Sequence, residues 1–253
     1  MARGLSRSYP FAMNHATAKL PEFFYRTAPQ ACPYLGGRVE RNIFAELDGQ
    51  NVSGTYDLLA RHGFRRSHKI VYRPDCPGCK ACIPVRVVTA EFSPSRNMRR
   101  IARANDDLTA EIGPPHASIE QFRLFQRYVR TRHADGEMAS MNYVDYRGMI
   151  EETSVNTRLV QFRDPPGELV AVGLIDALGD GLSAVYSFFD IDRAERSLGT
   201  YVILWLVQRS RIEGLPYTYL GYWIAASRKM AYKARFQPLE ALALDGWERM
   251  RFA

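Results

Sequence analysis

The pattern of apolar and polar residues is clearest in the second half of the chain, where it predicts a strand, a helix and another strand. Residues 182–189 alternate with the period of two that is typical of a strand. Residues 198–213 repeat apolar positions at helical spacing, and Gly214 follows where a glycine often ends a helix. Alternation at 217–221 predicts the second strand, and the sequence at 227–235 predicts a short basic helix.

Shorter patterns predict further elements in the rest of the chain. Ser118 and Gln121 have the spacing of a capping box, a pair of side chains that marks the start of a helix. Pro165 and Gly167 indicate a turn, so the strands on either side are predicted to pair antiparallel. The predicted strands are 39–47, 64–72, 85–92, 158–163 and 168–177, and the predicted helices are 53–61, 95–108, 119–133 and 144–152. This mixture of strands and helices indicates an α/β (α+β) fold.

The predicted elements divide into two lobes at a break near Glu111, ahead of the glycine and prolines at 113–115. Residues 20–110 are expected to form a small N-terminal lobe that is basic and contains all four cysteines. Residues 111–253 are expected to form a C-terminal α/β lobe. Residues 1–19 mix charged and apolar positions without a period, which predicts a mobile tail.

Length and composition are typical of a compact enzyme. The chain has 253 residues, of which 46% are hydrophobic and 24% are charged, as in ordinary globular proteins. No apolar run approaches the roughly 18–20 residues needed to span a bilayer. The first residues lack the apolar core of a secretory signal. We therefore expect no membrane association and a cytoplasmic location.

Positive charge is concentrated in one early block of the chain. The formal net charge is +7, and eleven Lys and Arg residues between Arg61 and Arg103 accompany only two acidic residues. This block therefore carries +9 and the rest of the chain −2. Such a block suits the phosphate backbone of a nucleic acid, and a well-solvated surface is the alternative. The candidate backbone contacts are Arg65, Arg66, Arg99, Arg100 and Arg103.

The four cysteines predict either a metal site or an ordinary turn. Cys76, Cys79 and Cys82 follow a C-x2-C-x2-C spacing that suits three thiolates around one metal ion, and Cys32 would complete a tetrahedral set for zinc or an iron–sulfur cluster. In the alternative, the proline and glycine at 77–78 simply form a turn, and Cys82 is a small buried residue. The sequence leaves both interpretations open.

Several segments resemble one enzyme family. Arg196 and Gly199 form an Arg-x-x-Gly turn that resembles part of the pyrophosphate-binding turn of GNAT acyltransferases. Longer segments resemble the aminoacyl-tRNA–protein transferases that tag N-terminal acidic residues, a family of eukaryotic arginyltransferases and, more similar still, bacterial aspartate/glutamate leucyltransferases. These segments are CPYLGGR (32–38), SGTYDLLARHGFRRS (53–67), YRPDCPGCKACIPVR (72–86), FSPSRNMRRIARANDDL (92–108), SAVYSFFD (183–190), RSLGTYVILWL (196–206), LPYTYLGYWI (215–224) and SRKMAYKARFQPLE (227–240).

The resemblance implies a GNAT-like C-terminal lobe and a reaction that needs no cofactor. The donor would be Leu-tRNA and the acceptor the α-amine of proteins that begin with Asp or Glu, which are thereby tagged for proteolysis as N-degrons. In the related arginyltransferases N-terminal cysteines are linked to iron–sulfur binding, but Leu35 stands here where a second cysteine would be expected. The alternatives are an arginyl-tRNA–protein transferase, an N-acetyltransferase that uses acetyl-CoA, and an RNA-binding module without catalysis.

The implied reaction does not need a strong general base. An aminoacyl-tRNA carries its amino acid as an ester, which is already activated toward amines. An α-amine has a pKa of about 7.7–8.0, so a sizeable fraction is neutral near pH 7. The enzyme chiefly has to hold amine and ester carbonyl in attack geometry and to stabilise the tetrahedral oxyanion. No covalent intermediate with the enzyme is required.

Candidate residues for the tRNA end cluster around the predicted helix start. Arg196, Gly199 and Thr200 are candidates for binding a phosphate near the 3′ end of the tRNA, because free N–H groups at a helix N-terminus attract anions. Asp190 ends a predicted strand, where it would accept a proton from the attacking amine or orient it. In the alternative, Asp190 only caps the following turn.

Candidate residues for the two substrates also follow the second strand. Tyr222 and Trp223 are expected to line the pocket for the amino acid or the adenine, with core packing as the alternative for Trp223. Lys229 and Lys233 lie four apart on one face of the predicted helix at 227–235. They are candidates for binding the acidic side chain of the acceptor, with plain solvent exposure as the alternative.

Overall fold

The computed structural model describes residues 18–132 and 136–251. The tail predicted at 1–19 therefore lies almost entirely outside the described residues. In the described part of the chain, no helix is both long and apolar enough to cross a bilayer.

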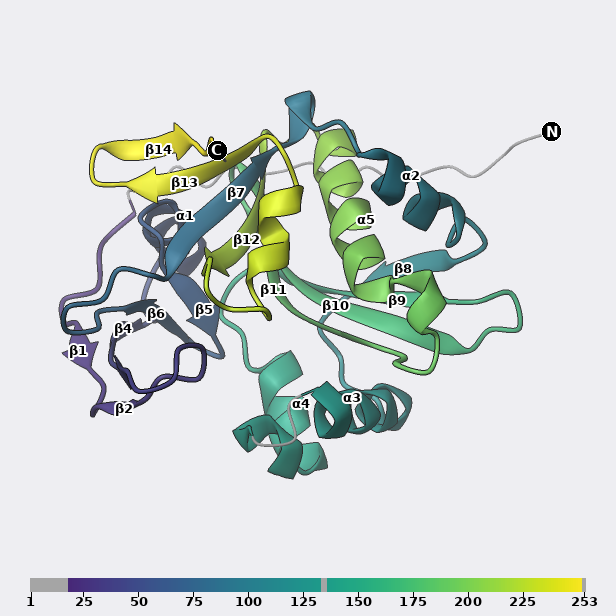
Figure 1. The fold of residues 1–253 in the computed structure, drawn as a ribbon. Coiled ribbons are helices and arrows are strands. Elements are labelled where there is room, and N and C mark those ends of the chain that lie inside the picture. Colours follow the sequence, from purple (N-terminus) through teal and green to yellow (C-terminus); the bar gives the residue numbers. More distant parts are fainter. Residues whose placement is uncertain (1–17, 133–135, 252–253) are drawn as a thin grey trace.

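An eight-stranded sheet forms the centre of the molecule (Figure 1). All neighbouring strands in it are antiparallel except for one pair, β11 and β12. In spatial order the strands are β14 (Gly246–Arg249), β13 (Leu239–Ala243), β7 (Ile83–Val88), β12 (Tyr217–Trp223), β11 (Gly181–Phe189), β10 (Leu169–Leu178), β9 (Thr157–Arg163) and β8 (Thr109–Gly113).

The parallel strands β11 and β12 separate soon after they begin. Their pairing covers only three residue pairs and ends at Ser183 and Tyr219. Beyond this point β11 continues to Phe189 and β12 to Trp223 without pairing to each other. The C-terminal ends of the two strands therefore leave an opening in the sheet.

Helices cover both faces of the sheet (Figure 1). The long helix α5 (Leu198–Ile212) connects β11 to β12 and packs on one face together with α2 (Arg96–Arg103). The helices α3 (Ile119–Arg132) and α4 (Tyr143–Glu151) lie on the other face, against β10 and β11. Both faces are apolar, so each helix layer buries its own hydrophobic cluster against the sheet.

A smaller sheet packs beside the end of the large one. It consists of β1 (Tyr25–Arg26), β4 (Asn42–Glu46), β6 (Ile70–Pro74) and β5 (Arg65–Ser67), with α1 (Val52–Arg61) against it. The short strands β2 (Gln30–Ala31) and β3 (Val39–Glu40) form a hairpin of their own. Single 3-10 turns occur at Thr89–Glu91, Glu137–Ser140, Ala194–Arg196 and Ala231–Arg235.

A buried ion pair joins the small sheet to the large one. The guanidinium of Arg66 in β5 donates to both carboxylate oxygens of Asp176 in β10, at 2.7 and 2.8 Å. Both side chains are almost completely buried, and the hydroxyl of Thr157 donates to the same carboxylate at 2.7 Å. The tRNA contact predicted for Arg66 is therefore wrong in this structure, because its guanidinium has no access to a phosphate.

The α/β class and most predicted elements are confirmed. The capping box is formed, since Ser118 accepts from the amide of Gln121 and Gln121 accepts from the amide of Ser118. The strands flanking the turn at 164–168 pair antiparallel, as predicted. The helix predicted at 198–213 is α5, and Gly214 follows it with a φ of 71°.

Several predicted boundaries were wrong. The strand predicted at 64–72 is the hairpin of β5 and β6, which turns at His68 with a φ of 52°. The strand predicted at 39–47 is split into β3 and β4. The helix predicted at 95–108 ends at Arg103, because the side chain of Asn105 donates to the carbonyl of Ile101. The helix predicted at 227–235 is a 3-10 turn over Ala231–Arg235 only.

The large sheet also extends across the predicted lobe boundary near 111. Its strand β7 comes from the residues assigned to the N-terminal lobe, and β8 (Thr109–Gly113) crosses the boundary itself. The edge strands β8 and β14, and the strand β13 beside β14, were not predicted at all. The N-terminal and C-terminal halves of the chain therefore share one sheet and do not merely pack against each other.

Candidate active site

The segment between β11 and α5 is a tightly held turn. Arg193 donates to the carboxylates of Asp164 and Glu168, each at 2.7 Å, and to Asp190 at 3.2 Å. Arg196 makes a bidentate pair with Asp107 at 3.0 and 2.7 Å. These contacts fix the position at which α5 begins.

Helix α5 begins with unpaired backbone N–H groups. Ser197 precedes it with a φ of 52°, and its carbonyl accepts from the amides of Thr200 and Tyr201. The amides of Leu198 and Gly199 have no acceptor among the described residues. Because Gly199 is half-buried, its N–H is a ready donor for an anion, and the helix dipole also favours negative charge there. This feature supports the predicted phosphate site.

Only glycine fits at position 199. A Cβ there would lie 2.7 Å from the ring of Phe189, the last residue of β11. The first turn of α5 therefore rests directly on the end of the strand. Close contact of this kind places the helix N-terminus beside the opening between β11 and β12.

The two predicted catalytic residues are both engaged within the protein. Asp190 accepts from the amide of Asp192 at 3.1 Å and pairs with Arg193, so it caps the turn, as its alternative interpretation described. The hydroxyl of Tyr222 donates to the carbonyl of Gly63 at 2.9 Å and lies 3.2 Å from that of Tyr72. Burial raises the pKa of Tyr222 and keeps it neutral. In this structure neither side chain is directed at a substrate.

Arg196 is likewise not a free cation. Its guanidinium is neutralised by Asp107, whose pKa is lowered by the hydrogen bonds that it accepts from Arg196. The positive contribution of this turn to an anion site therefore comes from the backbone N–H groups of α5 and not from Arg196. The side chain of Thr200 is half-buried next to them.

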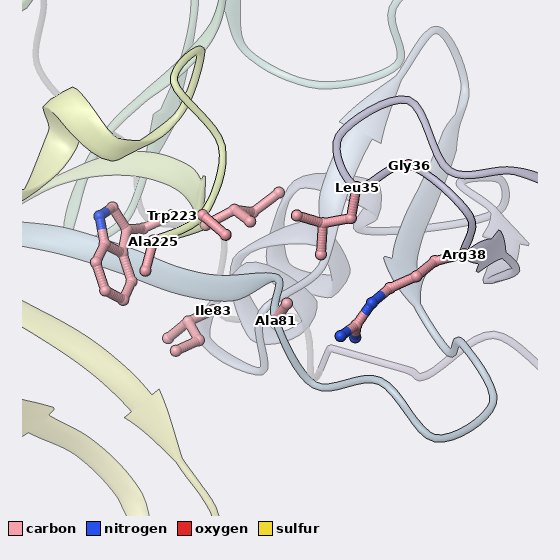
Figure 2. A pocket seen from close by; sticks show the side chains of 9 residues that line it. Leu35, Gly36, Arg38, Ala81, Ile83, Trp223 and Ala225 are labelled. Carbon is pink, nitrogen blue, oxygen red and sulfur yellow. The ribbon is translucent and has the colours of Figure 1, made fainter.

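Trp223 lies in the wall of a pocket of about 390 Å³, at the end of β12 (Figure 2). Its indole nitrogen lies 3.4 Å from the carbonyl of Ala231. The only charged side chain in the lining is Arg38, which donates to the thiol of Cys79 at 3.2 Å. The pocket is lined by Leu35, Gly36, Arg38, Ala81, Ile83, Trp223, Ile224, Ala225 and Ala226. It is therefore an apolar pocket with one cation.

Arg65 fills the opening between the parallel strands. Its Nη2 group lies within hydrogen-bonding distance of the carbonyls of Ala184 and Val185 in β11, just beyond the last residue that pairs with β12. On the β12 side its guanidinium lies against Gly221, which has a φ of 72°. A Cβ at Gly221 would lie 2.7 Å from Cζ of Arg65. Arg65 is thus placed inside the sheet and not on the surface that was predicted to bind tRNA.

Lys233 lies next to this opening and is buried. Its Nζ donates to the carbonyl of Tyr222 at 2.6 Å and lies 3.4 Å from the sulfur of Met230. Burial, and then the like charge of Arg65, lowers the pKa of Lys233 to about 7. Lys229 is exposed instead, because it lies in the turn before the 3-10 segment and does not share a helix with Lys233. The shared face predicted for the two lysines was therefore wrong.

The remaining basic candidates form an exposed surface on α2. Arg99 and Arg100 donate only to neighbouring polar atoms, the carbonyl of Pro94 and the side chain of Asn97. Within the described ranges, no carboxylate pairs with either of them or with Arg103. Because α2 packs on α5, these three side chains remain candidates for the tRNA backbone.

The four cysteines share one region of the N-terminal half. Burial, and then the nearby Cys76, Cys32 and Cys79, raises the pKa of Cys82 to about 12. Among the residues that the structure describes, however, no three side chains of His, Cys, Asp or Glu converge closely enough to hold a metal ion. The described side chains therefore do not show the geometry of a zinc site or an iron–sulfur cluster, and metal binding by the cysteines stays a prediction.

Comparison with known proteins places the chain in a family. The model for the N terminus of arginine-tRNA-protein transferase matches residues 30–100, and the model for its C terminus matches residues 120–243. An aspartate/glutamate leucyltransferase of Paramagnetospirillum magneticum is 56% identical over 94% of this chain and 97% of its own. A second, of Gluconacetobacter diazotrophicus, is 52% identical over 93% of this chain and 90% of its own.

Solved structures show weaker similarity. L-PGS from Bacillus licheniformis is 16% identical, with a TM-score of 0.45 over 58% of this chain and 48% of its own. FemX is 9% identical, with the same TM-score of 0.45, over 71% of this chain and 62% of its own.

The two family models match both halves of the chain, and the class that they define is that of aminoacyl-tRNA–protein transferases. Relatives at 56% and 52% identity cover nearly the whole chain and identify the narrower family within this class. The chain belongs to the aspartate/glutamate leucyltransferase family.

Proposed function

We propose that this chain transfers leucine from Leu-tRNA to the α-amine of proteins that begin with Asp or Glu, in the cytoplasm. The amine attacks the ester carbonyl of the aminoacyl-tRNA, a C–N bond forms, and the C–O bond to the tRNA breaks. The proton lost by the amine goes to the terminal ribose hydroxyl that leaves. The amide product carries leucine as its new first residue.

The apolar pocket beside Trp223 suits a leucyl side chain. Its walls include Leu35, Ile83 and Ile224, and its volume of about 390 Å³ is ample for an amino acid together with part of a nucleotide. The indole of Trp223 offers a face for stacking the terminal adenine. Arg38, the one cation, is in a position to attract a phosphate rather than a second cation.

Three carboxylates of the C-terminal half are already paired within the protein, which disfavours arginine as the amino acid transferred. A guanidinium side chain would need a carboxylate in its pocket, and Asp176, Asp190 and Glu240 are three carboxylates of the C-terminal half to consider for this. Asp176 is paired with Arg66 and Asp190 with Arg193. Glu240 is paired with Arg86 at 2.9 Å. Each is therefore neutralised inside the protein, and none lines the pocket.

The N-terminus of α5 and the basic face of α2 are proposed to hold the tRNA. The unpaired amides of Leu198 and Gly199 would bind a phosphate close to the 3′ end. Arg99, Arg100 and Arg103 would contact the backbone further along the tRNA. With both substrates held at the ends of β11 and β12, proximity supplies most of the rate acceleration.

The absence of a carboxylate from the pocket lining is the observation that carries the choice of leucine. The test offers Leu-tRNA, Arg-tRNA and acetyl-CoA separately to the purified protein with an Asp-initiated peptide. Transfer from Leu-tRNA alone is expected. Transfer from Arg-tRNA or from acetyl-CoA at a comparable rate would contradict the proposal.

A further inference from the structure

Two cations replace the missing hydrogen bonds where β11 and β12 separate. In a paired parallel sheet, strand carbonyls accept from the neighbouring strand. Here the carbonyls of Ala184 and Val185 in β11 face Nη2 of Arg65 instead. The carbonyl of Tyr222 in β12 accepts from Lys233. The opening is therefore lined from both strands by positive charge.

No negative charge compensates these two cations. Neither Arg65 nor Lys233 has an ion pair in the part of the chain that the structure describes. Burial raises the pKa of the neighbouring Tyr34 and Tyr232 to about 12, so these two phenols are neutral. A buried charge without a counter-ion is costly, and proteins keep such groups mainly where a ligand supplies the opposite charge.

Hydrogen-bond donors also remain unused in this opening. The Nη1 group of Arg65 is buried and has no partner among the described residues. The ammonium of Lys233 has three N–H donors, of which one is used by a carbonyl and one points at the weakly accepting sulfur of Met230. A buried donor without a partner is destabilising, so a bound acceptor would be favoured here.

The opening lies beside the pocket proposed for the aminoacyl end. Lys233 is bound to the carbonyl of Tyr222, and the next residue, Trp223, forms the pocket wall. A group held by Lys233 and Arg65 would therefore be close to an ester bound against Trp223. The side-chain carboxylate of an acceptor's first residue must also lie close to this ester, because the α-amine of the same residue attacks the ester carbonyl.

We infer that Arg65 and Lys233 together bind the side-chain carboxylate of the acceptor's first residue, an assignment that rests on the proposed function. The pair would select Asp and Glu over the uncharged Asn and Gln, which supply no counter-charge. The same positive charges disfavour the protonated α-ammonium and so favour the neutral, nucleophilic amine.

The test compares Glu-initiated and Gln-initiated peptides as acceptors in steady-state leucyl transfer. Loss of a hydrogen bond to a charged group corresponds to about a 10- to 100-fold change. For Lys233→Met we expect the KM of the Glu peptide to rise by about this factor, and the preference for Glu over Gln to fall by about the same factor. The KM for Leu-tRNA is expected to change by less than about twofold, because this side chain does not contact the donor. Lys233→Arg keeps the charge and is expected to retain most of the preference.

Two further variants separate this assignment from a general structural role. Arg235 is exposed two residues from Lys233, and Arg235→Met is expected to leave both acceptor constants unchanged. Arg65→Gln retains a donor for the strand carbonyls but loses the charge, and it is expected to lower the Glu preference as Lys233→Met does. An unchanged Glu preference in both Lys233→Met and Arg65→Gln overturns the inference. Failure of the wild-type protein to transfer leucine to any peptide contradicts the proposed function instead.

Discussion

Burial of Lys233 makes the stability of the protein depend on pH. The pKa of this side chain is about 7 in the folded protein, against 10.5 for an exposed lysine. Between these values the unfolded chain binds more protons than the folded one, so the free energy of unfolding rises with pH. The cost of burying the ammonium is fully present below about pH 7 and is relieved above it.

This leads to a prediction for Lys233→Met. The variant is expected to gain stability relative to the wild type below pH 7, and the gain is expected to shrink above it, by about 1.4 kcal/mol per pH unit at most. Urea unfolding of both proteins at pH 6.5 and at pH 9.5 measures the difference. A gain of equal size at the two pH values would show that burial does not lower the pKa of Lys233.

Arg66 and Asp176 illustrate the opposite case, a charge pair that is buried and complete. Removing one partner leaves the other uncompensated, so Asp176→Asn is expected to lower the free energy of unfolding by about 3–5 kcal/mol. Denaturant unfolding provides the measurement. Asp192→Asn, at an exposed position on the turn after β11, serves as the control and is expected to change stability by less than about 0.5 kcal/mol. A loss below about 1 kcal/mol for Asp176→Asn would contradict the role of the pair as the link between the two sheets.

At the level of elements, the start of α5 depends on its contact with β11. Gly199→Ala would place a methyl group 2.7 Å from the ring of Phe189 and displace the helix N-terminus. We expect kcat/KM for Leu-tRNA to fall by about 10- to 100-fold, since displacement by about 1 Å disrupts attack geometry. The second change Phe189→Leu creates space and is expected to restore part of the activity. An unchanged kcat/KM for Leu-tRNA in Gly199→Ala would show that this turn does not bind the donor.

The exposed face of α2 gives a second prediction at this level. The double variant Arg99→Glu with Arg103→Glu is expected to weaken tRNA binding and to reduce the slope of log Kd against log salt by about one per lost phosphate contact. Binding at several salt concentrations measures both effects. Arg147 is exposed on α4, across the sheet, and Arg147→Glu is the matched control. Equal behaviour of the two variants would show that α2 is only a solvated surface.

For the whole molecule, regular segments were predictable and local exceptions were not. The apolar periodicity of α5 and the alternation of β11 gave both elements almost to the residue. The hairpin of β5 and β6 was missed because it turns at His68, a residue type that gives no strong turn signal. Strands β13 and β14 were missed because they are short and partly exposed, so their alternation is weak.

For the proposed site, the sequence indicated a place but not which side chains are free. The sequence indicated the ends of β11 and β12, and Trp223 does lie in a pocket there. Whether an arginine is free depends on which carboxylate it meets in space, as Arg66 with Asp176 and Arg196 with Asp107 demonstrate. The position of Arg65 between the strands depends on the separation of β11 from β12, which no local pattern encodes.

The most direct measurement offers the wild-type protein total tRNA charged with a mixture of labelled amino acids, together with Glu-initiated and Gln-initiated peptides that are otherwise identical. The amino acid found on each peptide after a single turnover is then identified. We predict leucine on the Glu peptide and almost none on the Gln peptide. Arginine on the Glu peptide, or equal labelling of both peptides, would contradict the account.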